Sequence, residues 1–229
     1  MNLLKKINYE KIVGYIEQLV NIPSPTGYTS EIRDFLVTFA QNHQINYKVT
    51  KKGAVIFSFG PANPGTVFAA HIDTLGAMVS SVSEKRVKIT PMGGFPALYI
   101  IGERCTVHSR SGKVYAGTFL PDDPAVHVNS KLKDMKPDFD NCSIRMDIEI
   151  KDEKKMADLI NVGDFVSFDA GFRTVGGFVN SRHLDDKASA GIFLHLSTLM
   201  KDLEKHLDQR VSFFFNITEE TGQGLAGMP

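Results

Sequence analysis

The feature that most constrains the fold is a stretch of roughly a hundred residues, 76–176, in which helical periodicity is largely missing. Helical and buried-strand patterns flank it on both sides, over 1–75 and 177–229. Within it, glycine and proline closely separate short runs of β-forming residues, at 87–89, 98–101, 106–108 and 114–116. Strands spaced this closely are typical of a sandwich or barrel. We therefore predict a β-rich module inserted into an α/β domain.

Two amphipathic helices are predicted before any strand. Asn8 is a suitable N-cap for the first helix, whose apolar residues recur on one face until Pro23 ends it. Gly27 breaks the chain, and Thr29 or Ser30 can cap a second helix with the same periodicity. The flanking domain thus begins with helices.

The strands of this domain are predicted from apolar runs. Short β-rich segments fall between residues 45 and 59, and the continuous apolar run at 66–70 predicts a fully buried strand. A phenylalanine-rich run at 211–218 predicts a core strand, and 188–200 predicts a mostly buried helix whose small residues allow a close approach to the sheet. Together these segments predict an α/β fold with a mixed sheet and helices on both faces.

Charge and cysteine content exclude several classes of function. Lysine plus arginine and aspartate plus glutamate each number 26, so no net field attracts nucleic acid or an anionic membrane. Cys105 and Cys142 lack the C-x-x-C spacing of a thiolate zinc site, and they indicate no disulfide framework. No apolar run approaches the ~20 residues of a membrane span. We expect a cytoplasmic protein with small or neutral partners.

The first candidate site pair is His71 and Asp73, in the sequence Ala-His-Ile-Asp-Thr at the C-terminal end of a predicted strand. Ligand sites in open α/β sheets form outside the carboxyl ends of the strands. Residues two apart in an extended chain point to the same side. The Asp73 carboxylate can therefore reach one ring nitrogen of His71 and leave the other for a metal ion. An incidental ion pair at a polar strand end is the alternative.

Two adjacent aspartates, Asp185 and Asp186, stand just before the predicted helix at 188–200. A single carboxylate there is a common capping arrangement, which is the alternative for either residue alone. Two in succession allow one to cap while the other projects from the turn. In a two-metal centre, a carboxylate between the ions offsets the repulsion of divalent charges about 3.5–4 Å apart. Asp185 is the candidate for that bridging position.

Two adjacent glutamates, Glu219 and Glu220, follow the phenylalanine-rich strand. Acids directly after so apolar a run are costly if buried without a partner, and a nearby cation would compensate for their charge. Neighbouring residues of an extended chain face opposite ways. One glutamate can therefore bind a metal while the other acts as a base. A solvated strand exit into a glycine turn is the alternative.

Together the three motifs supply imidazole and carboxylate ligands of the kind that zinc, cobalt or manganese accepts. Their order, Ala-His-Ile-Asp, Leu-Asp-Asp-Lys and Thr-Glu-Glu-Thr-Gly, with Pro-Ser-Pro-Thr-Gly at 23–27, resembles the glutamyl or deblocking aminopeptidases that assemble as hollow tetrahedra. The β-rich insert at 76–176 is similar to the barrel-like dimerisation domain of that family. The resemblance covers essentially the whole chain.

The resemblance implies a dinuclear metallo-aminopeptidase that hydrolyses N-terminal residues from peptides with two divalent ions, zinc, cobalt or manganese. It assigns His71 to one metal, Asp185 to the bridge and Glu220 to the other metal. Asp73 would orient His71, and Glu219 would act as the general base. It further implies a cis peptide bond between Asp185 and Asp186, and a homo-oligomer that is a dimer or a dodecameric cage.

The expected ligand set is incomplete. Catalytic zinc usually has about three protein ligands, whereas this sequence supplies three groups for two ions. The family pattern adds an aspartate and a later histidine beyond Pro229, so a truncated sequence is the favoured interpretation. Lys187 stands where many relatives have arginine. Surface or core roles are expected for the other histidines, of which only His183 is near a motif: His43, His108, His127, His183, His195 and His206.

Two other functions stay open on sequence alone. A truncated or degenerate relative would act as a non-catalytic assembly or regulatory subunit. A glycosidase with paired carboxylates would make no use of His71, and its activity would survive chelators. The sequence does not indicate which N-terminal residue a peptidase would prefer.

Overall fold

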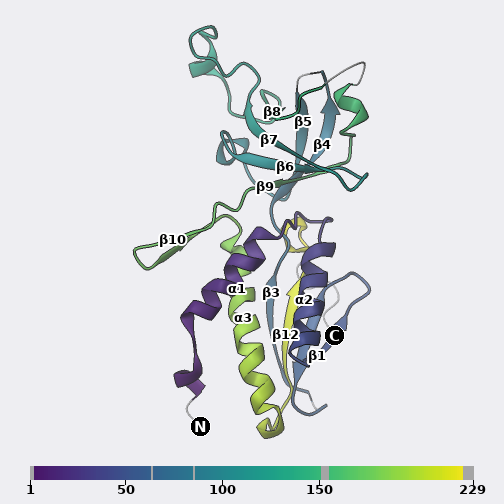
Figure 1. Cartoon of the computed structure of the whole chain (residues 1–229), viewed down its shortest axis with the longest axis vertical. Coiled ribbons are helices and arrows are strands. Elements are labelled where there is room, and N and C mark those ends of the chain that lie inside the picture. The colour runs from purple at the N-terminus through teal and green to yellow at the C-terminus, as the bar shows by residue number, and fades with distance from the viewer. Residues whose placement is uncertain (1–2, 63, 85, 151–154, 224–229) are drawn as a thin grey trace. The chain divides into compact units, whose positions relative to one another are not determined.

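The computed structural model describes residues 3–62, 64–84, 86–150 and 155–223. The chain divides into two compact units, each of which we describe by itself (Figure 1). The α/β unit consists of Met1–Thr74 and Ala170–Pro229, and the barrel unit consists of Leu75–Asp169. Residues 170–176, which the sequence pattern assigns to the insert, belong to the α/β unit.

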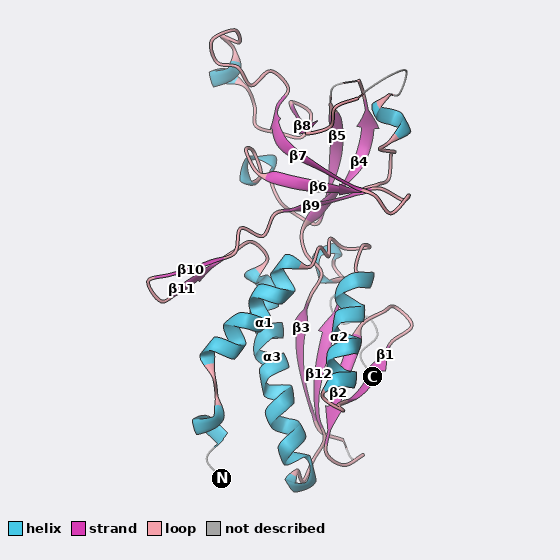
Figure 2. Ribbon diagram, in the orientation of Figure 1, coloured by secondary structure: helices cyan, strands magenta, loops and turns pink. Residues whose placement is uncertain are grey.

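A four-stranded mixed sheet forms the centre of the α/β unit (Figure 2). Its strand order is β1-β2-β12-β3, with bounds Asn46–Val49, Val55–Phe59, Val211–Asn216 and Thr66–His71. Strand β12 runs antiparallel to β2 and parallel to β3. The parallel pairing sets Asn216 beside His71, so the carboxyl ends of β3 and β12 meet at one edge of the sheet.

The described residues of this unit form three α-helices: α1 (Tyr9–Asn21), α2 (Ser30–Asn42) and α3 (Leu184–Leu203). The N-cap prediction for α1 is confirmed, because the side-chain oxygen of Asn8 accepts the main-chain N–H of Lys11. Thr29 is the N-cap residue of α2. A short hairpin of β10 (Arg173–Val175) and β11 (Phe178–Asn180) precedes α3.

Aromatic contacts fix the main core of the α/β unit. Phe39 of α2 stacks on Phe57 of β2, and Phe193 of α3 stacks on Phe213 of β12. Both helices therefore contact the same face of the sheet. A smaller buried cluster of Ala54, Ile56 and Phe214 occupies the other face.

The small residues of α3 have a different role from the one expected. A Cβ atom at Gly191 would lie 2.6 Å from Ile16 Cγ1 of α1, so glycine here allows two helices to approach each other. Ala190, by contrast, belongs to the core against the sheet. The close approach predicted between helix and sheet is thus partly one between α3 and α1.

Residues 66–70 form a strand, as predicted, but the prediction that this strand is fully buried is wrong. The strand exists as β3, but 37% of Val67 and 47% of Phe68 are exposed. The reason is the position of β3 at the end of the strand order, where its only neighbour among the described strands is β12. Only Ala70 and His71 at its C-terminal end are buried.

The barrel unit confirms the barrel-like prediction. Six strands close in the order β4-β5-β8-β7-β6-β9, with bounds Gly76–Val82, Val87–Met92, Cys142–Met146, Val114–Pro121, Arg104–His108 and Phe165–Phe168. The run at 98–101 is not a strand. It overlaps the 3₁₀ turn η2 (Ala97–Tyr99), in which Leu98 and Tyr99 are exposed, and Ile100 after the turn is buried.

The remaining elements are 3₁₀ turns: η1 (Leu3–Lys6), η3 (Leu132–Asp134), η4 (Met156–Asp158), η5 (Glu204–His206) and η6 (Glu219–Thr221). The segment 129–140, predicted to be an exposed loop, contains η3 and no buried residue. Within the described chain, no helix has the length and apolar character needed to cross a membrane.

Candidate metal centre

Residues from all three sequence motifs meet at the carboxyl edge of the sheet. His71 ends β3, Glu219 and Glu220 lie in η6 just after β12, and Asp185 lies at the start of α3. Asp185 Oδ1 lies 3.1 Å and Glu219 Oε2 lies 3.7 Å from His71 Nε2. The topology therefore brings a histidine and two acids, far apart in sequence, around one ring nitrogen.

The other ring nitrogen of His71 faces Asp73. Nδ1 lies 3.0 Å from the main-chain oxygen of Asp73 and 3.6 Å from its Oδ1. The main-chain carbonyl is thus the nearer orienting group, where the sequence led us to expect the carboxylate. In the neutral ring, donation from Nδ1 to this carbonyl leaves Nε2 free to act as a metal ligand.

The carboxylate of Asp73 is fully buried and serves other partners. Thr26 Oγ1 donates to Oδ2 at 2.7 Å. The main-chain N–H groups of Glu219 and Glu220 donate to Oδ1 and Oδ2, each at 3.2 Å. Burial by itself would raise the pKa of Asp73, but hydrogen bonds from His71, Thr26 and the two amides outweigh it and hold the pKa below its usual value.

The site is electronegative. Burial opposes charge on His71, yet Asp73 and Asp185 stabilise the protonated ring and raise its pKa to about 9. The pKa of Glu220 is raised by burial and by the negative charges of Asp73, Glu219 and Asp185, against the effect of His71. Excess negative charge of this kind is relieved when a cation binds.

Lys187 is a buried cation whose importance the sequence did not reveal. Its side chain has no exposed surface, and Nζ donates to the main-chain oxygens of Leu19 and Ile22 at the end of α1. Burial lowers the pKa of Lys187 to about 7, although the negative charge of Asp73 opposes that shift. Lys187 thus ties the Asp-Asp motif to the C-terminal end of α1.

The Pro-Ser-Pro-Thr-Gly segment also contributes buried groups that the sequence pattern did not assign. Ser24 Oγ donates to the main-chain oxygen of Ile72 at 2.8 Å, and Thr26 donates to Asp73. Pro25 forms a parallel bridge with Thr74. The segment therefore lies alongside the chain that leaves β3, a placement that depends on tertiary contacts and has no local sequence signal.

The Asp185–Asp186 peptide bond is cis, as the resemblance implied. His183 has a left-handed backbone, with φ of 66°, just before α3. Two of the other histidines have partners outside the site: His108 bonds to Ser167 in the barrel unit, and His195 accepts the Asn8 main-chain N–H.

The donors present suit a divalent metal in chemistry and spacing. Two ligands about 2.0–2.2 Å from one zinc ion lie roughly 3–3.5 Å apart. His71 Nε2 and Asp185 Oδ1 are separated by 3.1 Å, which meets this condition. The set is nevertheless incomplete, because no three His, Cys, Asp or Glu side chains among the described residues converge closely enough to form a metal site.

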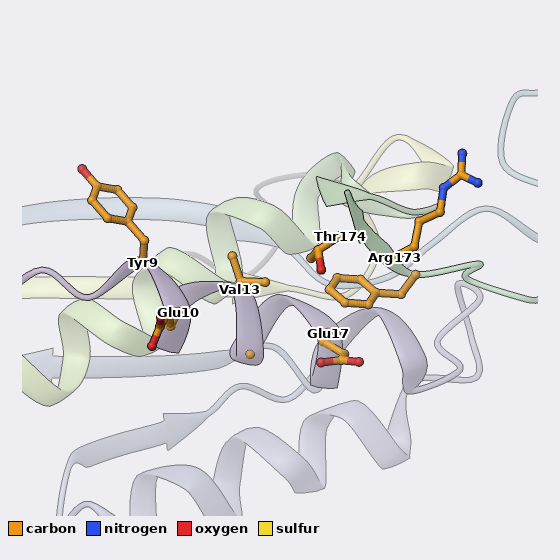
Figure 3. Close-up of a pocket in the computed structure, with 8 residues that line it drawn as sticks. Tyr9, Glu10, Val13, Glu17, Arg173 and Thr174 are labelled. Carbon is orange, nitrogen blue, oxygen red and sulfur yellow. The ribbon is translucent and has the colours of Figure 1, made fainter. Parts of the chain in front are cut away.

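A hollow of about 540 Å³ lies elsewhere on the α/β unit, between α1 and β10 (Figure 3). Glu10, Val13 and Glu17 line it from α1, and Arg173 and Thr174 line it from the hairpin. None of the residues of the candidate metal centre lines this hollow. It therefore adds nothing to the chemistry proposed for the sheet edge.

Comparison with known proteins places these motifs in a family context. The sequence profile of the M42 glutamyl aminopeptidase family matches residues 53–228. A candidate aminopeptidase of Bacillus subtilis (strain 168), YhfE, is 36% identical over 219 residues, which cover 93% of this chain and 63% of YhfE. The chain spans about three fifths of the length of the curated relatives it matches.

Solved structures share the fold. A TET aminopeptidase from a marine sediment archaeon of the Thaumarchaeota superposes with a TM-score of 0.82 at 21% identity, covering 95% of this chain and 62% of that chain. At this identity the likeness concerns the fold alone. PhTET1-12s, solved with a dodecamer in the asymmetric unit, gives a TM-score of 0.75 at 26% identity, covering 93% of this chain and 62% of that one.

Proposed function

Because the chain belongs to the M42 glutamyl aminopeptidase family, we propose that it forms the metal-binding part of an aminopeptidase that removes N-terminal residues from peptides. The observation that carries this proposal is the meeting of His71, Asp185 and Glu219 at the carboxyl edge of the sheet. All three residues lie within the segment that matches the family profile.

We propose that two divalent ions, zinc, cobalt or manganese, bind at this edge. His71 would hold one ion, Glu220 would hold the other, and Asp185 would lie between them. When bound, such ions lower the pKa of a water molecule toward about 7 and polarise the scissile carbonyl. The contact of His71 with Asp185 and the raised pKa of Glu220 support this ligand set.

Glu219 is proposed as the general base. Half of its side chain is exposed, so it can reach a water molecule and a peptide in solution, and its carboxylate already lies beside His71 Nε2. It would accept a proton from the attacking water and deliver it to the departing amine. The main-chain carbonyl of Asp73 would hold the ring of His71, and the carboxylate of Asp73 would hold the main-chain amide of Glu219.

The barrel unit is proposed as a dimerisation domain within a homo-oligomer, either a dimer or a dodecameric cage. The closed barrel, and the dodecamer found for PhTET1-12s, support this proposal. The two buried free cysteines support residence in a reducing compartment, the cytoplasm. Neither nucleic acid nor a membrane is proposed as a partner.

Hydrolysis of aminoacyl nitroanilides, with zinc or cobalt added, tests the proposal. We expect activity that EDTA abolishes and that Glu219→Gln lowers by about 10²–10⁴-fold while metal is retained, which is the usual contribution of a general base. Equal activity in the Glu219→Gln protein would reject the assigned base. A glycosidase with paired carboxylates would leave the nitroanilides intact and would hydrolyse a glycoside in the presence of EDTA.

A non-catalytic assembly or regulatory subunit is the second candidate function. The observation that favours it is that the described residues include no cluster of three ligands. Metal content separates the two candidates. A catalytic subunit should bind metal stoichiometrically and hydrolyse the nitroanilides, whereas an assembly subunit should oligomerise without either property.

A further inference from the structure

The contacts of Asp73 single out a residue to which no role has been assigned, Thr26. Its hydroxyl donates to Asp73 Oδ2 at 2.7 Å, the shortest hydrogen bond that this carboxylate makes. Thr26 is 5% exposed and Asp73 is fully buried, so water offers little substitute for this bond. Without the Thr26 hydroxyl, Oδ2 would keep only the longer hydrogen bond from the Glu220 main-chain N–H, at 3.2 Å, and losing a donor to a buried carboxylate is costly.

The same carboxylate holds the backbone of η6. Each of its oxygens accepts one main-chain N–H, from Glu219 and from Glu220. These amides open a 3₁₀ turn, where N–H groups have no partner within the turn itself. Asp73 therefore caps η6 from the segment that follows β3, and the position of its carboxylate sets the position of both glutamates.

The backbone around Thr26 is itself pinned. Its N–H donates to the main-chain oxygen of Thr74 at 3.3 Å, and the N–H of Thr74 donates to the oxygen of Ser24 at 2.9 Å. The hydroxyl of Ser24 donates to the main-chain oxygen of Ile72. Hydrogen bonds between residues 24–26 and residues 72–74 thus fix the backbone that carries the Thr26 hydroxyl next to Asp73.

We propose that Thr26 is a positioning residue for Glu219 and Glu220: by fixing the Asp73 carboxylate, it holds the two amides on which the placement of both glutamate side chains depends. This proposal rests on the proposed function for the roles of the two glutamates. Its geometric core, the coupling from the Thr26 hydroxyl to the two amides, is independent of metal and of activity.

Amide hydrogen exchange in the metal-free protein, followed by NMR, tests this coupling. Thr26→Ala and Thr26→Ser differ by a single hydroxyl. We expect the amides of Glu219 and Glu220 to exchange about tenfold faster in Thr26→Ala than in the unmodified protein, and to stay within about twofold of it in Thr26→Ser. If the alanine protein does not fold, Thr26→Val removes the same hydroxyl at nearly the original volume.

Thr198→Ala is the matched control, because its hydroxyl donates to the main-chain oxygen of His195 within α3. It should leave the exchange of both glutamate amides unchanged. Zinc affinity, measured on the same proteins, should fall about 10–100-fold in Thr26→Ala, which is the usual cost of losing a group that supports a ligand. Thr26→Ser should retain most of it.

Two results would overturn the proposal. One is unchanged exchange of both amides in Thr26→Ala, whether or not the protein binds zinc. The other is equal acceleration in Thr26→Ala and Thr198→Ala, which would indicate general loosening. A failure of the proposed function looks different, because zinc would then not bind the unmodified protein while the exchange difference between Thr26→Ala and Thr26→Ser would persist.

Discussion

The barrel unit and the sheet of the α/β unit treat their strand edges in opposite ways. Each of the six barrel strands has two neighbours, so the ladder closes on itself. The four-stranded sheet ends at β3, which exposes Val67 and Phe68. The residues of the candidate metal centre all belong to the open sheet and its adjoining elements. The closed unit therefore suits a scaffold, whereas the strand ends of the open sheet bring the candidate metal ligands together.

Truncating a core phenylalanine in each unit should give the largest difference between the two units. Phe119 of the barrel and Phe215 of the sheet are both fully buried, and replacing either with alanine should cost about 3–5 kcal/mol. We expect Phe119→Ala to raise amide exchange in the barrel strands, and Phe215→Ala to raise it in β2, β3 and β12. Exchange measured by mass spectrometry checks both. Equal loss of protection in both units after either substitution would show that they are not separate.

Valine-to-threonine substitutions in one strand of each unit should differ in their cost to the free energy of unfolding. Val79 in the barrel strand β4 is 1% exposed, so a hydroxyl there is buried and should cost about 1–3 kcal/mol. Val67 in β3 is 37% exposed, and Val67→Thr should cost less than about 0.5 kcal/mol. Chemical denaturation compares the two. A large cost for Val67→Thr would mean that the exposed face of β3 is covered in solution.

Mild acid should lower the stability of the α/β unit more than that of the barrel unit, by a smaller amount than the substitutions above. Burial, and then the charge of Lys11, lower the pKa of His195, while a hydrogen bond that the ring donates to the backbone of Lys6 opposes them. The unfolded chain therefore binds more protons as pH falls below about 6.5, and the α/β unit should lose stability there at no more than about 1.4 kcal/mol per pH unit. Protonation would also break the bond from the Asn8 N–H.

In the barrel unit, the carboxylate of Asp122 affects stability only at a lower pH. The pKa of Asp122 is lowered because hydrogen bonds from Lys88 and Ser143 outweigh the effect of burial, so its contribution is lost only below its unfolded pKa of about 3.9. Unit-resolved hydrogen exchange between pH 7 and pH 5 measures the difference. His195→Gln should reduce the loss of stability of the α/β unit below about pH 6.5. An undiminished loss in that variant would contradict the assignment to His195.

Local patterns predicted much of this structure. Asn8 caps α1, the phenylalanine run forms a buried strand, and the glycine-punctuated segment closes as a barrel. The motifs His-x-Asp, Asp-Asp and Glu-Glu were recognisable because strand ends and helix starts have local signals. Their meeting then followed from the parallel pairing of β3 with β12.

What the sequence could not predict depends on contacts between distant segments. An apolar run such as 66–70 does not reveal whether its strand is central or at an edge, so the exposure of Phe68 was missed. Lys187 and Thr26 gain their roles from partners 168 and 47 residues away, Leu19 and Asp73. The run at 98–101 has β-forming residues but begins in the 3₁₀ turn η2, and within the run only Ile100 is buried.

Calorimetric titration of the metal-free protein with zinc tests whether His71, Asp185 and Glu220 hold two metal ions. We predict two saturable equivalents per chain, with one lost in His71→Ala, one lost in Glu220→Gln, and both lost in Asp185→Asn. Asp186→Asn is the matched control and should retain both. The absence of saturable zinc binding in the unmodified protein, or an Asp185→Asn protein that binds zinc as well as the Asp186→Asn protein does, would contradict the account.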